Sequence, residues 1–187
     1  MHMPNTLLVS AFLLSLGTFG AFADGRNLGP PVTAADIAKW NNDIGPDGVG
    51  LPAGSGTSQQ GATIFAEKCA ACHGDGGRGA VTTKSGAPAA PALVTDKKRN
   101  GIDGATTTIA NFWPYAPPLF DYIRRAMPWN APRSLTDNEV YALTAYILAQ
   151  NKLIDEKETI DARTLPQVKM PNRNGFIVRF PNRTPSP

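Results

Sequence analysis

One short run constrains this chain more than any other feature of its 187 residues: Cys69-Ala70-Ala71-Cys72-His73. On a helix, residues three and four apart lie on one face, so two thiols and an imidazole would project together. C-x-x-C-H is the pattern at which two cysteines attach a haem covalently. The run therefore predicts one haem c, bound through Cys69 and Cys72, with His73 as an axial ligand of the iron.

Two other uses of a C-x-x-C pair fit the chain less well. A structural zinc site needs four Cys or His ligands. Cys69 and Cys72 are the only cysteines, and His2 is the only other histidine. A thioredoxin-like redox pair belongs in a βαβ context, which the helical, Gly- and Pro-punctuated surroundings do not indicate. Covalent haem remains the preferred interpretation.

The N-terminus predicts export to the periplasm. Leu7 to Leu16 is apolar apart from two serines, and Ala21-Phe22-Ala23 is typical of a signal-peptide cleavage site, with the cut after Ala23. The segment before the apolar run lacks Lys and Arg, so an uncleaved anchor is the alternative. No other stretch is long enough to span a membrane, so we expect no stable membrane insertion. A net charge of +3 does not indicate nucleic acid as a partner.

Composition and helix signals divide the chain into four parts and predict an all-α fold. We expect a signal peptide at 1–23, an N-terminal extension at 24–56, a haem domain at 57–152 and a C-terminal tail at 153–187. The extension is rich in Gly, Pro and Asp and has one helix start, at Thr33 to Asp36. The tail holds five prolines and few apolar clusters, so it should cross a surface without a core of its own.

Two strong helix starts bound the haem domain. Thr57 to Gln60 and Thr136 to Glu139 are both capping boxes. In the first helix Gly61 and Phe65 share a face that a second helix could approach closely. The last helix has an apolar stripe of helical period that supplies the natural partner: Val140, Leu143, Tyr146 and Ile147.

The second axial ligand follows by elimination. After cleavage no other histidine remains, and the remaining methionines are Met127 and Met170. Met127 ends an apolar run, Leu119 to Ala126, and Pro128 biases it toward extended backbone, which frees the thioether to reach a haem. Met170, in a proline-rich segment, is the fallback.

These residues together resemble a class I monohaem cytochrome c over the whole haem domain. The haem motif, the Met-Pro pair and the final helix from Leu135 to Tyr146 carry the resemblance. It implies that the Gly61 and Phe65 face crosses the last helix. It also implies that a loop proline, Pro91 or alternatively Pro88, offers its carbonyl to the Nδ1 hydrogen of His73 and so orients the ligand.

A narrower resemblance extends to nearly all of the mature chain. Several runs are similar to the cytochrome subunit of Sox-type sulfite or sulfane dehydrogenases, in its short single-haem form: Trp40 with Asp43-Ile44, Pro46-Asp47-Gly48, Gly50-Leu51-Pro52, Phe112-Trp113-Pro114-Tyr115-Ala116, Leu119 to Pro128, and Met170 to Ile177. The resemblance implies electron transfer from a molybdenum-cofactor subunit that oxidises sulfite or sulfane sulfur to a downstream cytochrome c or oxidase. The chain itself would then not be an enzyme.

Other expectations concern the cofactor's edge and the partner. Arg124 or Arg125 could reach a haem propionate, and Tyr115 or Trp113 could donate to it. The alternative is that the arginines are solvated surface side chains and the aromatic residues pack in the core. A free-standing soluble shuttle to a terminal oxidase is the alternative function. The two extensions favour a bound partner, because they carry scattered apolar residues that could anchor on another protein: Trp40, Ile44, Leu51, Phe176, Ile177 and Phe180. We expect the extensions to be mobile in the isolated chain.

Overall fold

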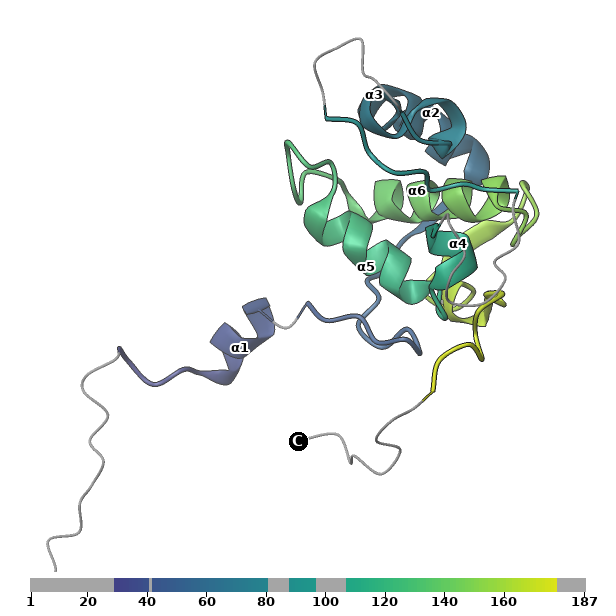
Figure 1. The fold of residues 1–187 in the computed structure, drawn as a ribbon. Coiled ribbons are helices and arrows are strands. Elements are labelled where there is room, and N and C mark those ends of the chain that lie inside the picture. The colour runs from purple at the N-terminus through teal and green to yellow at the C-terminus, as the bar shows by residue number, and fades with distance from the viewer. Residues whose placement is uncertain (1–28, 41, 81–87, 97–106, 178–187) are drawn as a thin grey trace, which may run out of the picture. The chain divides into compact units, whose positions relative to one another are not determined.

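The computed structural model describes residues 29–40, 42–80, 88–96 and 107–177 (Figure 1). The predicted signal peptide and Phe180 lie outside these residues. The chain divides into two compact units, Met1–Trp40 and Asn41–Pro187. Across the described residues, we find no helix of the length and apolar character needed to cross a membrane.

The first unit contributes one short helix, α1 (Ala34–Trp40). It begins where the sequence predicts, because the Thr33 side chain accepts a hydrogen bond from the Asp36 amide at 3.2 Å. The Thr33 hydroxyl in turn donates to the Asp36 carboxylate at 2.7 Å. This reciprocal cap satisfies amide groups that the first turn of a helix leaves free.

The second unit is helical apart from one short ladder, which confirms the all-α fold of a class I cytochrome c. Its elements in chain order are β1 (Ser55–Thr57), α2 (Ser58–Lys68), α3 (Ala70–His73), the 3-10 turn η1 (Asp75–Gly77), α4 (Ile109–Phe112), α5 (Pro117–Ala126), α6 (Asp137–Gln150), β2 (Thr159–Asp161) and the 3-10 turn η2 (Leu165–Gln167).

Both predicted capping boxes are confirmed. The Gln60 amide donates to the Thr57 hydroxyl oxygen at 3.3 Å, and the Thr57 amide donates to the Gln60 side chain at 2.9 Å. The same reciprocal pair joins Thr136 and Glu139 at the start of α6. The caps fix where α2 and α6 begin, and therefore which of their faces can meet.

The predicted crossing of α2 and α6 is also confirmed, and α2 lies against α6 in Figure 1. A Cβ atom built on Gly61 would overlap the carbonyl oxygen of Ala142 and lie 2.7 Å from the Cβ of Tyr146. One turn later the rings of Phe65 and Tyr146 pack with centroids 5.0 Å apart. The missing side chain at Gly61 is therefore what lets the two helices approach.

Gly61→Ala is expected to destabilise the protein by about 2 kcal/mol. The added methyl group must push the backbone of α2 away from that of α6, at a cost of about 3 kcal/mol. Alanine regains about 1 kcal/mol through its higher helix propensity. Chemical denaturation monitored by circular dichroism would measure the change. Thr63→Ala, on the exposed face of the same helix, is the control and should change the free energy of unfolding by less than about 0.5 kcal/mol.

The extension and the tail differ from the expectation that they contribute no core. β1 and β2 pair antiparallel, with Gly56 opposite Ile160, and so join the two segments. Ile160 and Leu165 are fully buried. Other buried side chains from the same segments are Ile44, Val168 and Met170. Ile44 and Leu51 of the extension and the tail up to Met170 therefore pack into the core of the second unit, and Ile44 and Leu51 are anchors within the chain itself.

Candidate haem site

The C-x-x-C-H run lies at the junction of α2 and α3. The Cys69 amide still bonds to the Phe65 carbonyl at 2.9 Å and so completes α2, while the Cys69 carbonyl accepts from the Cys72 and His73 amides at 3.1 and 3.0 Å. These bonds hold Cys69, Cys72 and His73 within a single helical turn. Both cysteines are free and partly buried, and burial raises the pKa of the Cys69 thiol to about 11.

His73 makes the contact that the resemblance implies. Its Nδ1 lies 3.2 Å from the carbonyl oxygen of Pro91. A carbonyl oxygen can only accept a hydrogen bond, so this contact favours the tautomer that carries its proton on Nδ1 and leaves Nε2 for iron. Pro88, the alternative, is exposed.

Backbone hydrogen bonds hold the Pro91 segment against the haem-motif segment. The Ala90 amide donates to the Cys72 carbonyl at 2.9 Å, and the Leu93 amide donates to the Gly77 carbonyl at 2.7 Å. The two bonds flank Pro91 on either side. The carbonyl that faces His73 is therefore positioned by the fold rather than by the histidine alone.

Asn151, at the end of α6, is a positioning residue that the sequence did not reveal. Its Nδ2 donates to the Leu93 carbonyl at 3.1 Å, and its Oδ1 accepts from the Thr95 amide at 3.2 Å. The pair of bonds ties the Pro91 segment to α6. A helix-ending asparagine is a common capping residue, so nothing in the sequence alone marked this one for a contact with residues far along the chain.

Met127 follows α5 in the backbone conformation that Pro128 was expected to impose. Its φ of −117° and ψ of 147° are extended, and its amide still bonds to the Ile123 carbonyl at 3.1 Å. The side chain is only partly buried. Met170, in contrast, is 3% exposed within the core. The thioether of Met127 is thus released from the helix at its end.

Five of the partly buried apolar side chains that pack on the core come from the haem motif, the Pro91 segment, α4 and the C-terminal ends of α4 and α5. They are Cys69, Leu93, Ile109, Trp113 and Met127. Their inner surfaces are covered by the core while their outer surfaces stay partly accessible, which suits contact with a flat apolar macrocycle. Two thiols one turn apart and an imidazole with Nδ1 engaged suit the attachment of a haem c, while ligation by the Met127 thioether stays a prediction.

The residues expected at the propionates have other partners. The Nε of Arg124 donates to the Asp137 carboxylate at 2.8 Å. The guanidinium of Arg173 lies 4.2 Å from the centre of the Tyr115 ring, and the rings of Trp113 and Tyr122 meet edge to face at 6.0 Å. Contact of Arg124 or Tyr115 with a propionate stays a prediction.

Comparison with known proteins places the chain in a family. The family model described as Cytochrome c matches residues 58–151, half of the chain. Among solved structures, the crystal structure of the sulfane dehydrogenase SoxCD from Paracoccus pantotrophus is similar, with 32% sequence identity and a TM-score of 0.70. The match covers 81% of this chain and 71% of that one. A search of curated proteins finds no match. This chain belongs to the cytochrome c family, and it is an electron-transfer protein that carries covalently bound haem c.

Proposed function

We propose that the chain is a periplasmic cytochrome that accepts single electrons from a molybdenum-cofactor sulfite or sulfane dehydrogenase subunit and passes them to a downstream cytochrome c or oxidase. The observation that carries the proposal is the extent of the structural similarity. The SoxCD match covers 81% of the chain, whereas the cytochrome c family model stops at residues 58–151. The similarity therefore includes segments that a free shuttle does not need.

The proposed roles of the chain's residues follow from the geometry of the site. Cys69 and Cys72 would hold the cofactor through thioether bonds, and His73 and Met127 would be the side chains that ligate its iron. When bound, haem c supplies one-electron chemistry at a potential that methionine ligation raises. Pro91 fixes the orientation of His73, and Asn151 holds the segment that carries Pro91. With both axial positions taken by side chains, the chain transfers electrons and leaves the oxidation of sulfur to its partner.

The partner contact is proposed to involve α1. Among residues 29–40, the described part of its unit, three large apolar side chains are exposed: Val32 and Ile37 at 71% and 57%, and Trp40 at 80%. A helix of seven residues is too short to be stable alone in water. An apolar surface on such a helix is suited to ordering against another protein.

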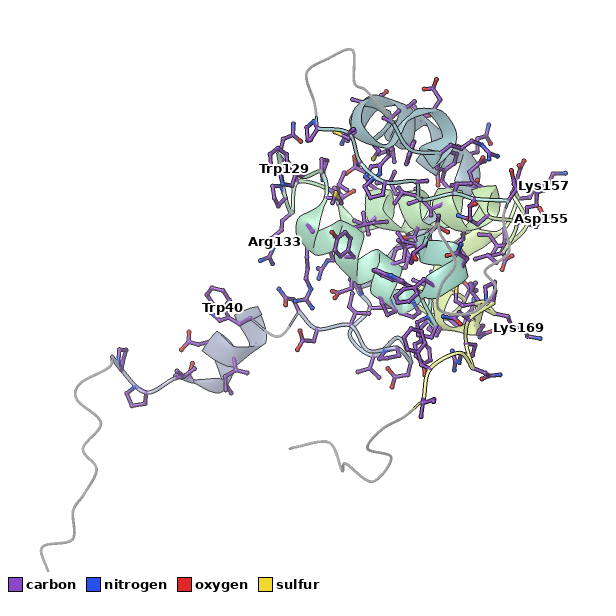
Figure 2. All side chains as sticks on the ribbon, in the orientation of Figure 1. Trp40, Trp129, Arg133, Asp155, Lys157 and Lys169 are labelled. Atoms are coloured by element: carbon purple, nitrogen blue, oxygen red, sulfur yellow. The ribbon has the colours of Figure 1, made fainter. Side chains whose placement is uncertain are left out.

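Replacing both Ile37 and Trp40 with serine is expected to weaken binding to the dehydrogenase subunit at least tenfold, because buried apolar anchors carry much of the energy of such interfaces. Surface plasmon resonance with the haem-loaded full-length chain would measure the affinity. The haem spectrum should not change, since no iron ligand is touched. Lys157→Ser, at an exposed turn of the second unit (Figure 2), is the control and should bind as the wild type does.

Two results would contradict the proposal in different ways. Unchanged affinity in the double variant would remove α1 from the interface. Failure of the intact chain to bind any molybdenum-cofactor sulfite or sulfane dehydrogenase subunit would favour the free-standing shuttle instead.

A further inference from the structure

A small pocket lies where α5 ends and α6 begins. Its volume is about 160 Å³, and its walls come from both helices, the loop between them and the segment before β1. At about 30 Å³ for each water, it could hold roughly five water molecules, so it also has room for a small inorganic ion. Its lining residues are Asn42, Arg124, Arg125, Arg133, Leu135 and Asp137.

Three arginines and one aspartate line this space, and Arg125 and Arg133 are exposed residues. The Nε of Arg124 donates to the Asp137 carboxylate at 2.8 Å. The Nε of Arg125 donates to the Asp121 carboxylate at 2.7 Å, and one of its terminal nitrogens donates to the Asp43 carboxylate at 3.0 Å. The side chain of Asp43 is 86% exposed, so water screens that second pair strongly. Each of the two arginines still has terminal N–H groups free of the carboxylate bonds that hold it.

Arg133 adds a third cation, for which the described part of the chain shows no ion pair. It lies on the loop after α5, at the same end of the domain as Trp129 (Figure 2). Its φ of 63° is in the left-handed region, which favours glycine or asparagine and costs an arginine about 1 kcal/mol or more. An arginine held at this strained position suggests that its side chain, rather than its backbone, is needed there.

We propose that this pocket binds a tetrahedral oxyanion of the sulfate class. Guanidinium groups donate paired N–H bonds to such ions, and three arginines line a space of suitable size here. Asp137 pairs with Arg124, and Asp121 and Asp43 pair with Arg125, which also donates to the Asn42 carbonyl at 3.2 Å. These contacts hold the two side chains in place, while the charge of Arg133 is left for the ligand. The inference does not depend on the proposed partner, because the isolated cytochrome carries the whole pocket.

Isothermal titration calorimetry of the haem-loaded full-length chain with sodium sulfate, at ionic strength kept constant with sodium chloride, tests the site. The expected result is one saturable site. Arg133→Asn, which removes the charge but tolerates the left-handed backbone, should weaken the binding at least tenfold. Arg163→Asn is the matched control, since the Arg163 side chain is 82% exposed and lies on the turn after β2. The affinity of this variant for sulfate should stay within twofold of the wild type.

Either of two outcomes would overturn the site. One is the absence of saturable sulfate binding by the wild-type chain. The other is equal loss of affinity in Arg133→Asn and Arg163→Asn, which would reveal an effect of overall charge. A thermal melt checks that Arg133→Asn is folded, and sulfate should raise the midpoint of the wild type but not that of this variant.

Discussion

Met127→Ala is expected to abolish the weak near-infrared band that sulfur-to-iron ligation gives an oxidised haem c, and to leave a high-spin or exogenously ligated haem. The physical reason is that Met127 is the thioether that α5 releases into extended backbone, whereas Met170 is buried in the core and loss of the thioether removes the proposed sulfur ligand. Absorption spectra of the oxidised and reduced protein would measure the change.

Met170→Leu is the matched control. Leucine conserves most of the volume of this buried side chain, so the core should tolerate it at a cost below about 1.5 kcal/mol. The near-infrared band should persist in this variant. A band that survives in Met127→Ala and disappears in Met170→Leu would move the ligand to Met170.

Replacing both Cys69 and Cys72 with alanine is expected to give a poorly folded, protease-sensitive chain. Covalent haem supplies apolar contacts and iron-ligand bonds that form fully only in the folded chain. A small domain without disulfides has little stability to spare. Thermal unfolding followed by circular dichroism, together with limited proteolysis, would measure the loss.

Wild-type chain produced without haem attachment is the control for this experiment. It should behave like the double variant, which would show that the missing haem, and not the two missing thiols, causes the loss. A cooperative thermal transition in the double variant close to the midpoint of the wild type would contradict the idea that the fold depends on its cofactor.

The sequence predicted those features that are encoded within a few residues. The caps at Thr57 and Thr136 are local hydrogen-bond patterns, and Pro128 acts on the backbone of its direct neighbour. The approach of α2 to α6 at Gly61 was predictable because both faces repeat with helical period. The contact between His73 and Pro91 came from the family resemblance, since no local pattern joins residues eighteen apart.

The features that the sequence did not predict are those that depend on contacts between residues far apart in the chain. Ile160 and Leu165 stand among polar residues and prolines, without the periodicity that indicates a buried face. The strands β1 and β2 are three residues long each, which is too short for alternation to be recognised. The arginine pocket likewise combines side chains from three segments, and only folding brings Arg133 and Asn42 to one place.

The β1–β2 ladder shows which part of the chain could be moved to another protein as a folded unit. The Tyr141 hydroxyl donates to the Pro52 carbonyl at 2.8 Å, Gly56 packs directly on Ala142, and Ile160 is fully buried. A chain trimmed to residues 58–151 would keep every cytochrome c signature yet uncover this side of α6. The part that could be exchanged between proteins as a working unit therefore runs from about residue 42 to residue 170, and changes in either flanking segment must be matched by changes in the helix beneath it.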